Sequence, residues 1–330
     1  MKPGTAGTLR LLADGEFHSG VALAASLAVS RASVWNAVRE LEAMGLPVYK
    51  VHGRGYRLPR ALSLLDRAAV ERGLGAAARF FAVEVRDSVT STNALLLDRA
   101  AAGAASGTVI AAEWQSAGRG RRGRAWQGGL AGGLAFSLLR RFTQGAGALS
   151  GLSLVVGVAL ARGLRALAGP CIALKWPNDI VTEQGKLGGI LIELTGDVLG
   201  PSAAVIGIGL NVRLAERVRR AIDQPATDLE TAIDGTVDRN ALLSGLLIHL
   251  DRALTVFASD GFAPFRPEWE SYHVHQGRTV VLALPGGRSE TGRARGIAED
   301  GALVLETRSG VRTFHSGEVS LRPIAAKRDR

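Results

Sequence analysis

The stretch Gly118–Trp126 reads GRGRRGRAW and places four arginines and three glycines in nine positions. These arginines could meet nucleic acid, as in a disordered basic tail, or hold a small anionic ligand in a folded site. The stretch occurs once, between the strand-like runs GTVIAAEWQ and GLAFSLLRRF. This setting favours a loop of a folded domain whose glycines let the backbone approach a ligand. A solvated basic loop is the alternative.

The sequence on both sides of this loop predicts a mixed core that begins near residue 66. Strand-like runs are RFFAVEVRDSV, CIALKWPNDIV, KLGGILIELTG and AAVIGIGLNVRL, in addition to the two that flank the loop. Helical patterns occur in STNALLLDRAAAGA, LSGLSLVVGVALARGLRALAG and RNALLSGLLIHLDRALTVFAS. Such a mixture is typical of an α+β or α/β domain of about 200 residues.

The N-terminal segment predicts a small winged helix-turn-helix. Ser19 and Ser30 are placed to cap two short helices, Gly45 ends the second, and PVYKVHGRGYRLP reads as a hairpin. Residues 1–60 carry eight Lys and Arg against four Asp and Glu. Arg31, Ser33 and Asn36 lie at the start of the second helix, where readers of the DNA major groove sit. A scaffold used only for packing or dimerisation is the alternative.

The C-terminal segment predicts a small β-barrel. After Trp269 the sequence consists of short strand-like runs separated by glycine, namely GRTVVLALPGG, TGRARGIAEDGALVLET and GVRTFHSGEVSLRP.

Composition limits the possible partners and compartments. The 330 residues have a formal net charge of +10, which favours anionic partners such as nucleotides or nucleic acid. A single cysteine, Cys171, excludes an internal disulfide and a cysteine zinc cluster, as suits a reducing cytoplasm. The start has no signal-peptide pattern, and the most apolar run, Leu152–Ala161, is too short to cross a bilayer. We therefore expect a soluble cytoplasmic protein without a membrane partner.

Two further motifs carry polar groups that a ligand site could use. In KWPNDI, Lys175–Ile180, a proline-directed turn presents an amide and a carboxylate, and Lys186 follows closely enough to flank a hairpin. In GIGLNV, Gly207–Val212, the glycines would admit a close ligand, and Asn211 offers a donor and an acceptor together. Each motif alone is weak.

Together, STN, GRGRRGR, KWPND, KLGGILIEL and GIGLN resemble biotin-protein ligases in order and spacing. LLADGEFHSG, GRGYRLP and the terminal GEVSLR resemble the bifunctional bacterial form, the biotin operon repressor. The resemblance implies a multi-domain α+β fold. Its parts would be a winged helix-turn-helix in residues 1–65, a catalytic domain related to class II aminoacyl-tRNA synthetases in 66–270, and an SH3-like barrel in 271–330.

The resemblance implies activation of biotin by MgATP to biotinoyl-5'-AMP, then transfer to a lysine of the biotin carboxyl carrier protein of acetyl-CoA carboxylase. The implied catalytic residues are Arg121, Lys186, Asp179 and Lys175. Biotin would contact Ser91, Thr92, Asn93, Gln115, Arg119, Gly120, Arg121 and Lys186. ATP or the adenylate would contact Arg119, Arg121, Arg124, Trp126, Asn178 and Asn211. No protein-bound metal site is expected.

The resemblance also implies regulation, in which the adenylate promotes homodimerisation and binding to operator DNA. One departure from the family lies after Trp126, where Gly133 and Ala135 replace the usual Asn and Tyr. We expect a more flexible ligand loop as the result. The alternatives are an adenylate-sensing repressor without ligase activity, a lipoate-protein ligase, and a ligase whose N-terminal segment is only a structural appendage.

Overall fold

The computed structural model describes residues 1–197, 199–284, 288–315 and 320–323. The chain divides into two compact units. The first consists of Met1–Leu139 and Val205–Ser244, and the second of Arg140–Ala204 and Gly245–Arg330. Each unit is described separately.

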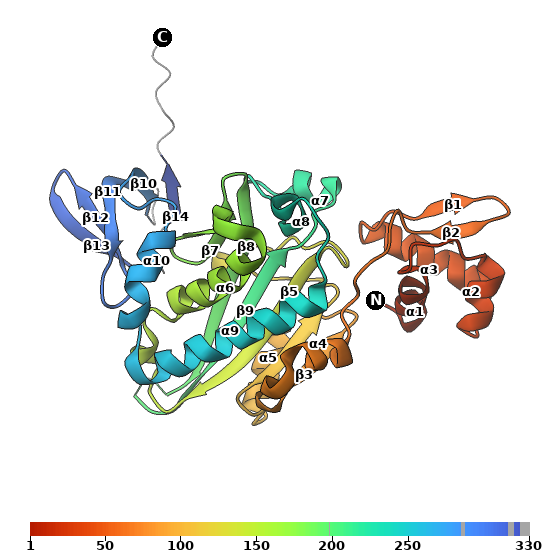
Figure 1. The fold of residues 1–330 in the computed structure, drawn as a ribbon, viewed down its shortest axis with the longest axis horizontal. Helices are drawn as coiled ribbons and strands as arrows, with labels where there is room; N and C mark the ends of the chain where they lie inside the picture. The colour runs from red at the N-terminus through yellow and green to blue at the C-terminus, as the bar shows by residue number, and fades with distance from the viewer. Residues whose placement is uncertain (198, 285–287, 316–319, 324–330) are drawn as a thin grey trace, which may run out of the picture. The chain divides into compact units, whose positions relative to one another are not determined.

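The winged region, residues 1–62, opens the first unit with three helices and a hairpin (Figure 1). Its elements are α1 (Pro3–Leu12), α2 (Gly20–Ser26), α3 (Arg31–Ala43), β1 (Tyr49–Val51) and β2 (Gly55–Arg57). The predicted caps are confirmed, because Ser19 Oγ accepts from Ala22 N and Ser30 Oγ accepts from Ser33 N. Helix α1 was not predicted as a distinct element, since its PGTAGT start has no polar cap.

The rest of the first unit contains a mixed β arrangement. Strand β3 (Ala82–Arg86) runs parallel to β4 (Thr108–Ala112), which is antiparallel to β5 (Gly133–Phe142). Helix α5 (Thr92–Ala101) connects β3 to β4 and begins at the Ser91 cap. The remaining elements are α4 (Arg67–Leu74), most of β9 (Ser202–Asn211), α7 (Glu216–Ala221), α8 (Leu229–Ile233) and the start of α9 (Arg239–Asp260).

After the end of β5, the second unit contains helix α6 (Leu152–Ala168), labelled in Figure 1, and three antiparallel strands. These strands are β6 (Ala173–Lys175), β7 (Asp179–Thr182) and β8 (Gly185–Gly196). The strand-like run CIALKWPNDIV forms two strands, β6 and β7, and the turn predicted in KWPNDI is confirmed at Trp176–Asn178 between them. Glycines let α6 pack closely, with Gly157 facing Leu174 and Gly163 facing Leu246 of α9.

The second unit ends in helix α10 (Arg266–Tyr272) and a five-stranded antiparallel sheet. The strands are β10 (Thr279–Ala283), β11 (Ser289–Ile297), β12 (Leu303–Thr307), β13 (Gly310–Phe314) and β14 (Ser320–Pro323). The prediction of several short C-terminal strands is confirmed. Residues 317–319 of the GEVSLR motif lie outside the described residues.

One described helix, α9, is long and apolar enough to meet the length and composition criteria for a membrane span. Half of its most apolar window is buried within the protein. Leu246 and His249 of α9 pack against Gly163 of α6.

Candidate functional site

A buried polar network occupies the start of helix α5 in the first unit. Gln115 Oε1 accepts hydrogen bonds from Thr92 N at 2.8 Å and from Thr92 Oγ1 at 3.1 Å. Ser137 Oγ lies 2.8 Å from Thr92 Oγ1 and 2.5 Å from Asn93 Oδ1. Ser91 Oγ accepts from Ala94 N as the helix cap. The structure thus brings together four of the residues predicted for biotin.

Ser137 belongs to this network and was missed by the sequence analysis. It is fully buried in β5, where it is the one hydroxyl between the apolar residues Phe136 and Leu138. A lone polar residue in an apolar strand costs free energy unless it is hydrogen-bonded. That pattern was the available signal, and its partner could not be known before α5 was placed.

The glycines of the GIGLN motif are explained by the side chains that lie on them. A Cβ atom at Gly207 would overlap Asn93 Oδ1. A Cβ atom at Gly209 would come within 2.5 Å of Trp126 Cε2. Both approaches are far below van der Waals contact, so a larger residue would displace Asn93 or Trp126. The expectation that these glycines leave room for a ligand is corrected, because in this structure two site side chains cover them.

The arginine-rich stretch folds into a small hairpin of its own. Trp126 N donates to Gly118 O at 2.9 Å, and Gly120 N donates to Arg124 O at 2.7 Å. Arg122 adopts a left-handed conformation with φ of 59°, which only a minority of non-glycine residues adopt. Arg119 and Arg124 are exposed, whereas Arg121 is half-buried. The prediction of a loop within a folded domain is confirmed.

Asn211 lies at the end of β9 and is buried. Its Nδ2 donates to Thr227 O at 3.0 Å. The side chain therefore fixes the segment that leads into α8, and this bond accounts for one of its donors.

The second group of site residues lies in the second unit, where β7 and β8 form a hairpin. Lys186 Nζ is 2.6 Å from Asp179 Oδ1, which confirms that the two motifs meet. Asn178 Nδ2 donates to Ile190 O at 2.7 Å, and Ile190 N donates back to Asn178 O at 2.9 Å. The KWPND turn is therefore bound to β8 by side chain and backbone together.

Lys175 is the last residue of β6, at the start of this turn, and it lies close to two buried histidines. Burial, and next the positive charge of Lys175, lower the pKa of His275 to about 4. Burial likewise lowers the pKa of His273 to about 3, with His275 as the next cause. Both rings are therefore neutral at pH 7. The His273 ring stacks on Trp269 with 4.6 Å between centroids.

The residues predicted for DNA binding lie on the first turns of α3. Arg31, Ser33 and Asn36 are all exposed. Ser33 Oγ also lies 2.9 Å from the capping Ser30 Oγ. Trp35, on the same helix, is 46% exposed, and the Arg39 guanidinium lies 4.8 Å from its ring centroid.

A buried ion pair that the sequence analysis did not predict supports the first unit. Arg239 Nη2 lies 2.7 Å from Glu113 Oε2, and each side chain is 3% exposed. Arg239 also donates to the carbonyls of Ser63 and Gly133. The pair therefore joins the linker after the winged region to β5. No local sequence pattern indicates a contact across more than a hundred residues.

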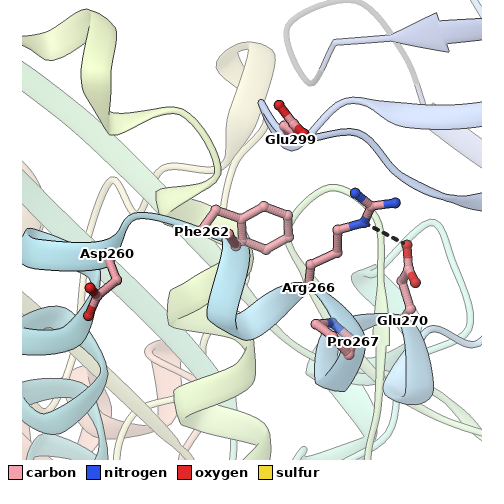
Figure 2. Close-up of a pocket in the computed structure, with 7 residues that line it drawn as sticks. Asp260, Phe262, Arg266, Pro267, Glu270 and Glu299 are labelled. Carbon is pink, nitrogen blue, oxygen red and sulfur yellow. Dashed lines mark hydrogen bonds and ion pairs between the residues drawn. The ribbon is translucent and has the colours of Figure 1, made fainter.

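Figure 2 shows a cavity in the second unit, between the end of α9, helix α10 and the turn before β12. The Arg266 guanidinium points to Glu270, with 3.4 Å between Nε and Oε1. None of the predicted site residues lines this cavity. Among the residues that the structure describes, no cluster of three or more His, Cys, Asp or Glu side chains could hold a metal ion.

Comparison with known proteins agrees with these observations. Residues 85–211 match the biotin/lipoate A/B protein ligase family, and residues 275–322 match the biotin protein ligase C terminal domain. Residues 8–57 match an HTH domain. The bifunctional ligase/repressor BirA of Escherichia coli strain K12 is 38% identical over 314 residues, which span 95% of this chain and 96% of that protein. The chain belongs to the family of bifunctional biotin-protein ligases and repressors.

Other members of this biotin-protein ligase family show the same relationship. The bifunctional ligase/repressor BirA of Bacillus subtilis strain 168 is 30% identical over 310 residues, 94% of this chain and 95% of that protein. The biotin protein ligase of Aquifex aeolicus in complex with biotin and ATP has a TM-score of 0.62 and 30% identity, and covers 73% of this chain and 98% of its own. A point mutant of that ligase in complex with biotin gives a TM-score of 0.63, also at 30% identity, and covers 74% of this chain and 99% of its own.

Proposed function

We propose that this protein activates biotin with ATP and transfers the biotinoyl group to a lysine of a carrier protein, and that it also represses transcription. The observation that carries the proposal is the pair of contacts on β9. Asn93 of the polar network lies on Gly207. Trp126, the last residue of the arginine loop Gly118–Trp126, lies on Gly209. Strand β9 thus positions both the polar network and the cationic loop. A ligand with an uncharged polar ring and an anionic tail requires a site with both of these features.

In the first step, the biotin carboxylate must approach the α-phosphate of ATP although both are negative. Arg119, Arg121 and the backbone N–H groups around Gly120 reduce this repulsion. A carboxylate oxygen attacks the α-phosphorus, the bond to the bridging oxygen breaks, and pyrophosphate leaves. Lys186 stabilises the negative charge as a compact cation.

The ureido ring of biotin has N–H donors and a carbonyl acceptor, so its pocket must supply both kinds of partner. Ser91, Thr92, Asn93 and Gln115 are assigned to this role. The bonds among Thr92, Gln115 and Ser137 support it, because a network of this kind holds the side chains in fixed orientations.

For the nucleotide, Trp126 is assigned to stack on adenine and Asn211 to read its edge. Arg124 and Asn178 contribute to the phosphate and ribose side. Mg²⁺ would arrive with ATP and be held mainly by phosphate oxygens, since it usually keeps only one or two protein ligands.

In the second step, a carrier lysine attacks the acyl carbon of biotinoyl-5'-AMP. A new C–N bond forms, the acyl C–O bond breaks, and AMP leaves with the bonding electrons. The lysine must first lose a proton, and Asp179 binds or orients its ammonium group. Lys175 adds positive charge beside the departing phosphate. The proposed acceptor is the biotin carboxyl carrier protein of acetyl-CoA carboxylase.

The proposed repressor activity uses the winged region, with the adenylate as the corepressor that promotes homodimerisation. Two copies would place α3 of each winged region in successive major grooves of a palindromic operator. Arg31→Ala should weaken operator binding and lower its salt dependence by about one counterion for each copy, or about two for the dimer. Ligase activity should stay unchanged. No change in sedimentation with biotin and ATP would contradict the dimerisation part.

The proposed domain limits are 1–65, 66–270 and 271–330, with a class II synthetase-like central domain and an SH3-like C-terminal barrel. The protein is proposed to act in the cytoplasm, where biotin carrier proteins and operator DNA are both present. The five-stranded antiparallel sheet of the last segment supports the barrel assignment.

Lipoate ligation is the second candidate, because the matched family includes lipoate ligases. Lipoate has no ureido group, so the polar side chains around Thr92 favour biotin. Pyrophosphate release with biotin or lipoate as the acid tests the choice. Release with biotin at least a hundredfold faster is expected. Equal rates, or a preference for lipoate, would contradict the assignment.

A further inference from the structure

Trp35, on helix α3, is the most exposed tryptophan of the chain. Its neighbour Val34 is 1% exposed and belongs, with Val38 and Leu41, to the apolar cluster of the winged region. Trp35 lies outside that cluster and keeps 46% of its surface exposed, whereas the other four tryptophans are buried or half-buried. The packing of the winged region therefore does not depend on this indole ring.

Arg39 lies over the Trp35 ring. Its guanidinium carbon is 4.8 Å from the ring centroid, as the spacing of one helical turn allows. The electron-rich face of an indole ring attracts a cation in this position. A guanidinium over a ring can still donate hydrogen bonds from the N–H groups at its edge. The pair therefore combines an apolar ring with a set of donors.

The Arg39 side chain carries its charge back toward the start of α3. Helical side chains point toward the N-terminus of their helix, and the Arg39 guanidinium accordingly lies over a ring of the preceding turn. Trp35 follows Arg31, the first residue of α3, by four residues or about 6 Å along the axis. The N-terminal residues of the second helix make the base contacts in helix-turn-helix proteins. The pair thus belongs to the part of α3 that is proposed to enter the major groove.

The exposed face of α3 is cationic, because both carboxylates of this helix are engaged by neighbours. Glu40 Oε2 accepts from Thr5 Oγ1 at 2.7 Å, and Glu42 Oε2 lies 2.7 Å from Lys50 Nζ. The two arginines of the helix are exposed. A single aromatic ring among cations fits a polyanion that also presents apolar groups, as duplex DNA does in its major groove. A protein partner would instead fit a contiguous apolar patch.

The major groove offers a partner for each member of the pair. Thymine presents its C5-methyl group there, and guanine presents the acceptors O6 and N7, which an arginine can bind with two hydrogen bonds. Ser33 and Asn36 can hydrogen-bond to phosphates or to base edges, but neither presents an extended apolar surface. Trp35 therefore supplies a kind of contact that these polar residues of α3 lack.

We propose that Trp35 and Arg39 are specificity-determining residues of operator binding, with the Trp35 ring packed on a thymine methyl group and the Arg39 guanidinium bound to a nearby guanine. The proposal rests on the proposed repressor activity. It adds two residues to Arg31, Ser33 and Asn36. It also predicts that each half-site of the operator contains one thymine whose methyl group is required and one guanine whose N7 is required.

The test for Trp35 uses the full chain with biotin and ATP, and a palindromic duplex that the unaltered protein selects from a randomised library. Each thymine is replaced in turn, in both half-sites, by deoxyuridine, which lacks only the C5-methyl group. One such replacement should weaken binding by about fifteenfold, since each lost methyl contact is worth about fourfold. The same replacement should change the affinity of Trp35→Ala by less than about twofold, because the contact is already absent.

The test for Arg39 uses Arg39→Lys, which keeps the charge but loses the planar fork of donors. Each guanine is replaced in turn by 7-deazaguanine, which lacks N7. One replacement should weaken binding by the unaltered protein at least about fivefold and leave the affinity of Arg39→Lys nearly unchanged. Both proteins should bind a scrambled duplex equally, because contacts to phosphates depend on charge and not on sequence.

Two control variants separate this role from an effect on folding. Val21 of α2 is 60% exposed, and Val21→Ala should keep the full loss on deoxyuridine replacement. The melting temperature of Trp35→Ala should stay close to that of the unaltered protein, because the ring lies outside the apolar cluster. Leu41→Ala, from within the cluster, should lower it.

Three outcomes would overturn the proposal. The first is an equal effect of deoxyuridine on the unaltered protein and on Trp35→Ala at every thymine. The second is an equal loss of affinity in Trp35→Ala for the selected and the scrambled duplex. The third is weaker dimerisation of Trp35→Ala without DNA, which would place the ring against a second copy of the chain. Failure of the proposed repressor activity is distinguishable, because the unaltered protein would then select no preferred duplex, and this assignment would fail with it.

Discussion

The ammonium of Lys186 lies 2.6 Å from a carboxylate oxygen of Asp179, and the two side chains are only 20% and 16% exposed. Residues from two motifs, KWPND and KLGG, are thus one charged unit at the β7–β8 hairpin. Desolvation strengthens the interaction of such a pair with each other and with a ligand. A phosphate arriving there would compete with Asp179 for the lysine.

Lys186→Ala should lower the rate of adenylate formation by about 10² to 10³, because it removes a positioned cation from the reacting phosphate. Asp179→Asn should slow transfer to the carrier more than adenylate formation. Pyrophosphate release measures the first step, and the mass of the carrier measures the second. Arg220→Ala, which breaks an exposed ion pair with Glu216, is the control and should leave both steps unchanged. Equal losses in both steps for Asp179→Asn would contradict its assignment to transfer.

Gly209→Ala should destabilise the protein by about 1–3 kcal/mol and weaken ATP binding, because its methyl group would displace Trp126. Gly245→Ala is the matched control, since a Cβ atom there meets nothing within 4 Å inside helix α9. That change should be neutral or stabilise by up to about 1 kcal/mol. Urea unfolding and nucleotide titration measure the two effects. Unchanged stability and unchanged ATP affinity in Gly209→Ala would show that β9 does not hold Trp126.

Arg239→Ala should cost about 3–5 kcal/mol of unfolding free energy, because it leaves the buried Glu113 carboxylate without its charged partner. Arg67→Ala breaks an exposed pair with Glu71 and should cost less than about 1 kcal/mol. Denaturant unfolding of both variants at one pH provides the comparison. A similar small loss in both variants would show that Glu113 finds another partner.

The winged region and the main elements of the core could be predicted from the sequence, because serine caps and apolar spacing are local signals. Ser19 and Ser30 indicated where two helices begin, and the structure agrees. The motif order also indicated that Asp179 and Lys186 meet. These are short-range relationships along the chain.

Contacts between distant segments could not be predicted in this way. The role of Gly207 depends on Asn93, and that of Gly209 depends on Trp126, both far away in sequence. Leu130 reads as an ordinary apolar residue in a glycine-rich loop, yet it is buried with the core of the winged region. Ser137 and the Glu113–Arg239 pair likewise depend on partners that only the folded chain brings together.

Stability should fall as the pH is lowered from about 6.5 toward 4, because His273 and His275 stay neutral in the fold and become protonated when the chain unfolds. Their pKa values of about 3 and about 4 lie below the ordinary value of 6.5. The unfolded state then binds more protons, and each histidine adds a slope of up to about 1.4 kcal/mol per pH unit. His273→Phe should reduce this slope in urea titrations between about pH 4.5 and 6. An unchanged slope would mean that water reaches the ring.

The most direct test of ligase activity is the intact mass of an apo biotin carrier domain after incubation with the protein, biotin, ATP and Mg²⁺. The expected result is a gain of one biotinoyl group on one lysine, absent without ATP and greatly slowed in Lys186→Ala. A carrier whose mass does not change, with protein that still binds biotin, would contradict the ligase assignment and leave an adenylate-sensing repressor.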